Sequence, residues 1–353
     1  MKKIDHYLYL FILIILYSNC SSQYEEQGYI LTVTGKMATD EMGMTLTHEH
    51  VVTNFSGADK IAQPQYDEDY VINIILPHLK ELKKKGINTI FECTPDYIGR
   101  DVELLKKLSE LSGINIITNT GYYAAANKKY LPAHVYSESK ETIAKRWEKE
   151  WEEGIDGTGI RPGFIKLGTG EGELDSIETK LLKAAVIVSK NTGLTIAIHT
   201  GDGEAAFSEY DIIVKEGWKG NKMIWVHAQN GSDEERIALA KKGVWISLDG
   251  ISELRMEAFL TMVKFMKESN LLSKLLISHD DGWSVVNNSG NVELILFENG
   301  NTKPYNTIII KFIDELYKTG FTKEEINRLL IENPKNAMAI RKRVLYCEGK
   351  NPD

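Results

Sequence analysis

The chain has 353 residues, of which 42% are hydrophobic and 26% are charged, a composition that suits one large globular domain or two smaller ones. Its formal net charge of −8 is spread along the sequence without a basic cluster, which argues against nucleic-acid binding. Its three cysteines have no paired spacing, which argues against a disulfide framework and against a cysteine-based zinc site.

The first twenty residues differ in character from the rest of the chain. A charged start, MKKID, is followed by the apolar run HYLYLFILIILYSN, which is short for a membrane span, and then by Cys20 and the polar stretch SSQYEEQG. This pattern resembles a bacterial lipoprotein signal peptide over residues 1–20, with Cys20 as the lipidated residue and 21–29 as a flexible tether. A signal anchor or an ordinary cleaved signal are the alternatives, since Asn19 is larger than the residue usual before such a cysteine. All three put the rest of the chain outside the cytoplasm, and the lipoprotein reading puts it in the cell envelope, anchored to a bacterial membrane.

From about residue 30 the sequence alternates strand-like and helix-like stretches. Short apolar runs predict strands at 44–50, 87–94, 114–121, 161–168, 194–200, 222–228, 244–250 and 275–281. Amphipathic stretches between them, such as 70–86, 101–113, 175–193 and 233–243, end in glycine, as helices commonly do. Eight strands with intervening helices predict a (β/α)₈ TIM barrel, one domain over residues 30–345 with a tail at 346–353. An open doubly wound sheet is the competing architecture.

Side chains that bind metals stand at the ends of five of these strands. His48 and His50 are two residues apart, so in a strand they point to the same face. Four later apolar runs also stop at such a side chain, and the set is His48, His50, Lys166, His199, His227 and Asp280. A closed barrel brings the carboxyl ends of its strands to one point, whereas an open sheet would not collect five of them.

In this order the six residues resemble the amidohydrolase superfamily, and the chain is more closely similar to the phosphotriesterase family. The resemblance runs from about residue 30 to about residue 340. It is carried by LTVTGKMATDEMGMTLTHEHVV, PDYIGRDVELLKKLSE, GTGIRPGFIKLGTG, LTIAIHTGDG, ISHDDGW and IENPKNAMAI.

The resemblance implies a binuclear metal site. His48, His50 and Asp280 would hold one divalent ion and His199 and His227 a second, with Lys166 bridging both as a carbamate. An unmodified lysine ammonium has no lone pair to donate and would repel the ions, whereas a carbamylated lysine is a long carboxylate that spans both. We favour zinc for this nitrogen and oxygen ligand set, although manganese, cobalt or iron would also fit.

The implied activity is that of a metal-dependent hydrolase acting on a small-molecule substrate. It would cleave an ester, a lactone or a phosphoester through a metal-activated hydroxide, with Asp280 as the proton acceptor. Family members often form dimers, so a homodimer is also implied. Two alternatives stay open, namely an amide-bond hydrolase of the same superfamily and a non-catalytic barrel lipoprotein.

Three positions depart from the specialised branches of the family. The histidine or arginine that follows the strand-seven aspartate in those branches is missing, because Asp249 is followed by Gly250. The relay aspartate after the strand-six histidine is replaced by Asn230. Tyr123, in TNTGYY, falls where the lactone-cleaving members have a tyrosine near the hydroxide, although it could also be a rim aromatic without a role. Tyr123 and Asp249 are our candidates for substrate contacts.

Overall fold

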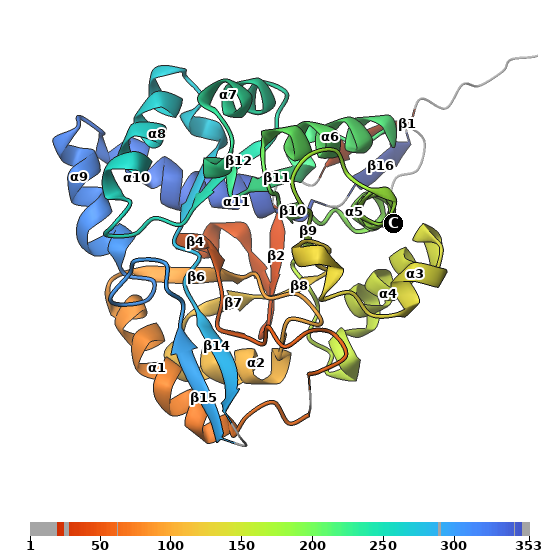
Figure 1. Cartoon of the computed structure of the whole chain (residues 1–353). Coiled ribbons are helices and arrows are strands. Elements are labelled where there is room, and N and C mark those ends of the chain that lie inside the picture. The colour runs from red at the N-terminus through yellow and green to blue at the C-terminus, as the bar shows by residue number, and fades with distance from the viewer. Residues whose placement is uncertain (1–19, 25–27, 62, 289–290, 342, 348–353) are drawn as a thin grey trace, which may run out of the picture.

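Eight strand positions, each followed by a helical segment, build the molecule (Figure 1). This computed structural model describes residues 20–24, 28–61, 63–288, 291–341 and 343–347. The barrel strands are β4 (Met44–Glu49), β6 (Ile87–Glu92), β7 (Asn115–Ile117) with β8 (Asn119–Thr120), β9 (Phe164–Gly168), β10 (Ile196–His199), β11 (Met223–Val226), β12 (Trp245–Asp249) and β13 (Leu275–Ser278).

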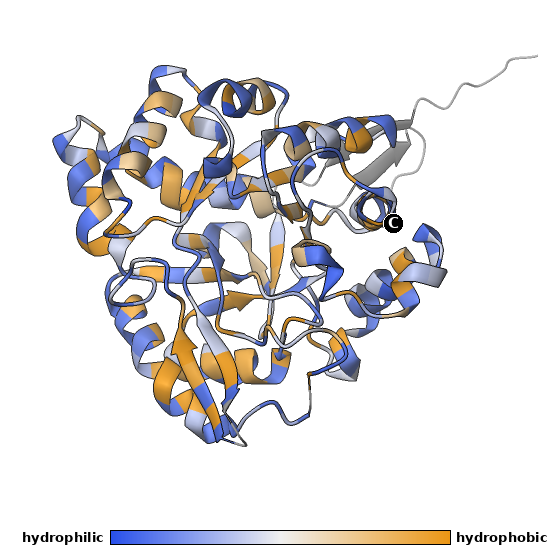
Figure 2. Cartoon of the chain, in the orientation of Figure 1, coloured by the Kyte–Doolittle hydropathy of each residue, from blue (hydrophilic) through white to orange (hydrophobic). Residues whose placement is uncertain are grey.

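The helices lie outside the strands. They are α1 (Glu68–Lys84), α2 (Val102–Ser112), α3 (His134–Ser137), α4 (Lys140–Glu153), α5 (Ser176–Thr192), α6 (Gly203–Lys215), α7 (Asp233–Lys241), α8 (Met256–Glu268), α9 (Ile313–Lys318), α10 (Lys323–Asn327) and α11 (Asn333–Met338). Hydrophilic and hydrophobic residues alternate along them (Figure 2), as amphipathic helices require. In α2, for example, Leu104 and Leu108 are buried and Lys107 is exposed.

The parallel strands follow chain order around the barrel. Strands β8 to β13 form one six-stranded parallel sheet, and β4, β6 and β7 form a second sheet. Only Thr118 separates β7 from β8, and its carbonyl accepts a hydrogen bond from Gly163 N at 2.8 Å. On the other side, Asp280 N donates to the carbonyl of His48 at 3.1 Å, which links the end of β13 to β4. These two junctions close the (β/α)₈ barrel that the sequence predicts.

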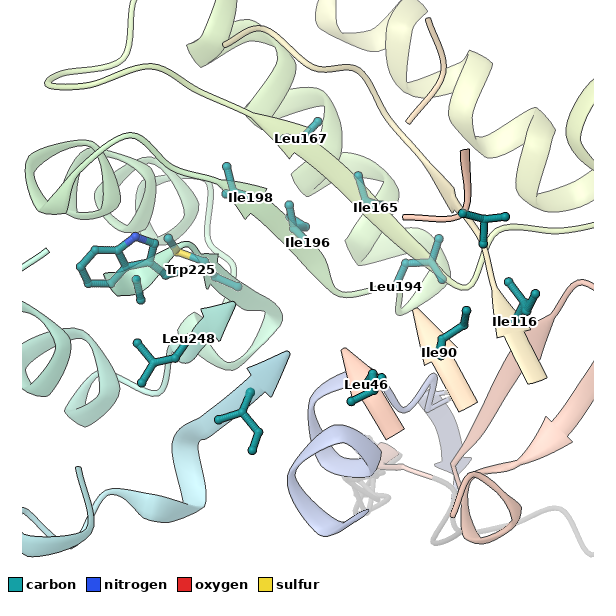
Figure 3. Close-up of a cluster of buried hydrophobic side chains, with 14 of the residues drawn as sticks. Leu46, Ile90, Ile116, Ile165, Leu167, Leu194, Ile196, Ile198, Trp225 and Leu248 are labelled. Atoms are coloured by element: carbon teal, nitrogen blue, oxygen red, sulfur yellow. The ribbon is translucent and has the colours of Figure 1, made fainter. Parts of the chain in front are cut away.

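The two faces of the barrel strands bury different sets of side chains. Outward-facing residues on successive strands, among them Leu46, Ile90, Ile165 and Ile198, pack under the helices in one large cluster (Figure 3). Residues of the inner face fill the barrel axis in a second cluster, which consists of Ile30, Met42, Phe91, Cys93, Ile117, Phe164, Ala197, Ile224, Val226, Trp245, Leu276, Ala337 and Met338. The interior is therefore a packed core whose closed end is plugged by the chain before β4 and by α11.

Five further strands and a terminal pair lie outside the barrel wall. Strand β14 (Trp283–Asn288) pairs antiparallel with β15 (Asn291–Leu296) and parallel with β5 (Val52–Thr53), which begins two residues after His50. Trp283 of this hairpin packs on His78 of α1, with 5.3 Å between ring centroids. The remaining strands are β1 (Cys20–Tyr24), β2 (Tyr29–Thr32), β3 (Gly35–Ala38), β5 (Val52–Thr53), β14 (Trp283–Asn288), β15 (Asn291–Leu296) and β16 (Arg343–Cys347).

The predicted leader falls almost wholly outside the described residues. Of residues 1–20 only Cys20 is described, as the first residue of β1, which pairs antiparallel with β16. Residues 21–24 of the predicted tether belong to the same strand, and 25–27 lie outside the described part. Among the residues described, no helix combines the length and apolar character needed to cross a membrane.

Every predicted strand corresponds to an observed one, with ends that differ by at most three residues. The predicted helices at 70–86, 101–113, 175–193 and 233–243 correspond to α1, α2, α5 and α7. Gly113 and Gly193 end α2 and α5 in the left-handed conformation, with φ of 75° and 81°. The short runs in parallel strands are fully buried on both faces, which is why an apolar run was a sufficient signal.

The inner core should be sensitive to loss of volume. Phe164 and Phe91 are both fully buried and pack edge to face, with 5.5 Å between ring centroids. We expect Phe164→Ala to lower the free energy of unfolding by about 3–5 kcal/mol, because it leaves a cavity in a close-packed interior. Denaturant titration measures this. Leu111→Ala, at a side chain that is 51% exposed, is the control and should change stability by less than about 0.5 kcal/mol. An equal loss in the two variants would contradict the packed-core description.

Candidate metal centre

An irregularity in β4 aims the first two histidines into the barrel. Leu46 pairs with Ile90 and Glu49 pairs with Glu92, so β4 has one residue more than β6 over this stretch. Such a bulge reverses which face the following side chains occupy, and bulges are frequent beside functional sites. Leu46 therefore packs outward under the helices, whereas His48 lies against residues of the barrel axis.

His48, His50 and Asp280 meet at one point. The Asp280 Oδ1 atom lies 3.2 Å from His48 Nε2 and 3.3 Å from His50 Nε2. One ligand atom from each of the three residues falls within 4.8 Å of the others, a spacing that a single ion could bridge. Two imidazole nitrogens and a carboxylate oxygen form a donor set that suits zinc and other divalent first-row metals.

His199 and His227 continue this cluster. The ring centroids of His48 and His227 are 5.1 Å apart, and those of His227 and His199 are 4.4 Å apart. His227 begins the turn after β11 in the left-handed conformation, with φ of 61°, a rare backbone state that is found at functional sites. Four imidazoles from three strands thus lie in one continuous group.

Lys166 is buried beside the histidines. Lys166 is 1% exposed. Burial is the main cause that lowers the pKa values of His50 and His199, and the charge of Lys166 lowers them further. Within the described residues no carboxylate forms an ion pair with it. An ammonium group among imidazoles is unfavourable without a compensating charge, since burying an unpaired ion costs several kcal/mol. A carbamate on this nitrogen would replace the positive charge with a negative one and would offer oxygen ligands.

The carboxylates hold a proton on one histidine. Burial and Lys166 lower the pKa of His48, but Asp280 and Asp249 outweigh them and raise it to about 9. Burial lowers the pKa of His50 to about 4. Despite burial, His48 and His50 hold the pKa of Asp280 well below its usual range. A divalent cation bound between these groups would take the place of the proton on His48.

Asp249 lies beneath the histidines. Its carboxylate is 2.5 Å from His227 Nδ1 and 3.3 Å from His48 Nδ1, and the residue is 1% exposed. A carboxylate on the far nitrogen of a ligand histidine fixes the ring orientation and leaves Nε2 facing the metal. Thr94 Oγ1 does the same for His50 Nδ1, at 2.8 Å. This burial does not fit the substrate contact that we expected of Asp249.

Aromatic rings border one side of the mouth. Tyr123 is 5.0 Å from His199 between ring centroids, and Phe297 is 5.7 Å from His50. Phe55 and Tyr130 complete the series between them, with centroid distances of 5.9–6.1 Å. Tyr123 lies on Gly168, where a Cβ atom would come within 2.4 Å of its ring. The expected place of Tyr123 near the site is therefore compatible with substrate contact.

The opposite side of the mouth is polar. Gln229 donates to the Asp249 carbonyl and lies 3.5 Å from His227 Nδ1. Gly250 leaves space in which a Cβ atom would be 3.4 Å from both Gln229 Nε2 and Arg255 Nη1. Arg255 is exposed. The sequence showed that Gly250 lacks the side chain found there in the specialised branches. It did not indicate that Gln229 and Arg255 flank Gly250.

The sequence profile of the phosphotriesterase family matches residues 28–338. The chain belongs to the phosphotriesterase family. An aryldialkylphosphatase of Saccharolobus solfataricus is 28% identical over 84% of this chain and 94% of its own length. A phospho-furanose lactonase of Mycoplasmopsis synoviae is 26% identical, over 89% and 92%. An N-acetyltaurine hydrolase of Salmo salar is 27% identical, over 89% and 99%.

The barrel of this family member also matches solved structures. An organophosphorus hydrolase of Deinococcus radiodurans superposes with a TM-score of 0.78, covering 89% of this chain and 98% of its own at 24% identity. That likeness supports the fold. The family assignment supports metal-dependent hydrolysis, and the donor set described above fits metal binding.

Two buried groups near the site were given no role from the sequence. One is the set Glu49, His279 and Asp281, which alternates with the candidate metal ligands. The other is Glu209 of α6, which accepts hydrogen bonds from Thr169 at 2.6 Å and from Thr200 at 3.0 Å, just beyond β9 and β10. The alternation of charged residues in HEH and HDD was a usable signal for the first set, whereas nothing local distinguishes Glu209 from a surface acid.

Glu209 should make stability depend on pH. Burial raises its pKa to about 8, although the threonine hydrogen bonds lower it. A raised pKa means that the folded state binds the proton more tightly, so the stabilisation is full below about pH 4.5 and is lost as the pH rises towards 8. Between pH 5.5 and 8, we expect the free energy of unfolding of Glu209→Gln to be about 1–3 kcal/mol higher than that of the wild type. Denaturation midpoints at several pH values measure this, and a difference that does not change with pH would refute the assignment.

Proposed function

We propose that this protein is a hydrolase with a binuclear metal site bridged by carbamylated Lys166, which cleaves an ester, lactone or phosphoester bond. The observation that carries the proposal is the convergence of His48, His50, Asp280, His199 and His227 around a buried lysine that has no carboxylate partner among the described residues. Family membership supports the same reaction class, because relatives include an aryldialkylphosphatase and a lactonase. Zinc is our first choice of metal, with manganese, cobalt and iron as alternatives.

The residues of the proposed site have different roles in the reaction. Two divalent ions, when bound, would lower the pKa of a water molecule and polarise the oxygen of the bond to be cleaved. Asp280, which stays ionised at neutral pH, accepts the proton of the attacking water. Asp249 keeps the Nε2 atoms of His48 and His227 turned towards the centre. Tyr123, at the mouth, orients the substrate together with the aromatic side of the rim.

The mouth favours a substrate with both apolar and polar parts. The series Tyr123, Tyr130, Phe55 and Phe297 provides an apolar side, and Gln229 and Arg255 provide donors on the other side. An amide substrate is the second candidate, because one relative carries the name N-acetyltaurine hydrolase. Ester and amide hydrolysis need the same ligands, so the residues that hold the metals do not discriminate between them.

Loss of Lys166 should abolish turnover. We expect Lys166→Ala to lower kcat/KM by more than about 100-fold, with partial recovery on addition of acetate or propionate, whose carboxylate replaces the bridge. The assay uses a panel of lactones, aryl esters, an N-acyl amide, a phosphodiester and a phosphotriester. The preferred panel member in the wild type identifies the bond.

Lys222→Ala is the matched control for this experiment. Lys222 is a partly buried lysine at the other end of the barrel, where it donates to the Gly193 carbonyl at 2.6 Å, and its removal should leave turnover unchanged. Absence of turnover by the metal-reconstituted wild type would exclude the enzyme and favour a non-catalytic barrel lipoprotein. Full activity of Lys166→Ala would exclude the bridge.

We further propose that the protein is anchored in the cell envelope through a lipid on Cys20, and that it forms a homodimer. Tyr29 bridges to Ile340, and Ile30 lies in the plug of the closed end. Eight residues lie between Cys20 and Tyr29, so these two residues can be at most about 30 Å apart. An anchor of that length would hold the closed end towards the membrane and leave the mouth facing away from it.

Cys20→Ser should release the protein from the membrane. With the leader intact, we expect the wild type in the membrane fraction and labelled by an alkyne palmitate analogue, and Cys20→Ser unlabelled. Equal labelling or equal membrane recovery of both would contradict the lipid anchor. Light scattering of the purified protein tests the dimer.

A further inference from the structure

The residues that alternate with the metal ligands on β4 and at the end of β13 form a second buried cluster. Glu49 lies between His48 and His50, and His279 and Asp281 flank Asp280. Glu49, His279 and Asp281 are all fully buried. Their ligand atoms also fall within 4.8 Å of one another, so by spacing alone they could hold an ion.

Hydrogen bonds already occupy the donor atoms of this cluster. Glu49 Oε1 accepts from Ser278 Oγ at 2.7 Å and from His279 Nδ1 at 2.8 Å. Its Oε2 accepts from Asp281 N at 2.9 Å. His279 Nε2 accepts from Ile308 N at 2.9 Å, so the ring is the neutral tautomer with its proton on Nδ1. No ring lone pair is left for a metal.

The cluster also joins the chain that follows β15 to the metal-binding strands. Asp281 accepts from Asn301 Nδ2 at 3.0 Å and from Tyr305 N at 2.7 Å. The Tyr305 hydroxyl donates to the His50 carbonyl at 2.6 Å. Phe297, at the start of the same segment, packs on His50. Segment 297–308 is thus fastened at several points to the backbone that carries the ligands.

These contacts lie at the seam of the barrel. The described residues contain no regular ladder between β4 and β13, yet His48, His50 and Asp280 must meet across that junction. Two backbone hydrogen bonds cross this junction, from Asp280 N to the His48 carbonyl at 3.1 Å and from His50 N to the Asp281 carbonyl at 2.7 Å. Ser278 Oγ accepts from His48 N at 3.0 Å and donates to Glu49, so side chains add cross-links to this short backbone pairing. Fully satisfied buried networks of this kind fix a unique geometry.

We propose that Glu49, His279 and Asp281 form a polar lock that positions the metal ligands and couples metal retention to the docking of segment 297–308. The lock is a set of positioning residues and binds no ion itself. This inference rests on the proposed function in one respect, namely that His48, His50 and Asp280 bind a metal. It predicts that segment 297–308 is more protected from exchange in the metal-loaded protein than in the metal-free protein.

The test compares Glu49→Gln and His279→Asn with the wild type. Zinc affinity is measured by competition with a chromophoric chelator, and hydrogen exchange is followed in peptides from 297–308 with and without zinc. We expect both variants to bind zinc about 10–100-fold more weakly, as removal of partners of ligand residues commonly does, and to exchange faster in 297–308. Asparagine keeps a donor near the Nδ1 position but cannot accept from Ile308 N. Compared with Glu49→Gln, we therefore expect His279→Asn to accelerate exchange in 297–308 more and to weaken zinc binding less.

Glu150→Gln is the control. Glu150 forms a largely buried ion pair with Arg100 at 2.7 Å, away from the metal ligands. This variant should lower the unfolding temperature without changing zinc affinity or exchange in 297–308, which separates positioning from general stability.

Each outcome decides a separate question. If the wild type binds no metal, the proposed function fails. Wild-type affinity in Glu49→Gln would overturn the lock alone. A metal count that drops by one ion in that variant, with the His48 and His50 site still loaded, would show an ion-binding cluster instead. If neither variant folds, the wild type decides, because equal exchange in 297–308 with and without zinc would overturn the coupling.

Discussion

The charge balance at the open end of the barrel is the constraint on which the rest of the structure depends. Four histidines, Lys166 and the carboxylates of Asp249 and Asp280 lie together in a region with little solvent. Such groups are tolerated only when each charge is compensated. Asp249 and Asp280 compensate a proton on His48, but Lys166 has no carboxylate ion pair in the described part of the chain. In the proposed site, metal ions and a carbamate on Lys166 would replace these protons and balance the charges.

Because side chains alternate between the two faces of a strand, neighbouring residues in each of two short segments serve different purposes. In HEH and HDD the residues that face the axis are the proposed metal ligands, and the residues between them face a buried polar network. The bulge in β4 determines which of its residues face the barrel axis, because without it His48 would share a face with Leu46. The proposed metal site and the contacts that hold segment 297–308 therefore use neighbouring residues of the same two strands. A one-residue shift of β4 would disturb both.

Much of this could be predicted from the sequence, for physical reasons. Buried parallel strands are apolar runs that end in polar residues, so their positions and the convergence of His48, Lys166, His199, His227 and Asp280 followed from the pattern and the barrel geometry. The role expected of Asp249 did not follow, since the pattern places a residue at a strand end without telling whether neighbouring rings cover it. The contacts of Glu49 and Glu209 depend on residues far away in the chain. The signal peptide and the lipid on Cys20 remain predictions.

An X-ray structure of zinc-loaded crystals, with anomalous data collected at the zinc absorption edge, would show the metal site itself. We expect two anomalous peaks, one beside His48, His50 and Asp280 and one beside His199 and His227. We also expect additional density on Lys166 Nζ that reaches both. A single peak, or two peaks with an unmodified Lys166 between them, would contradict the bridged site.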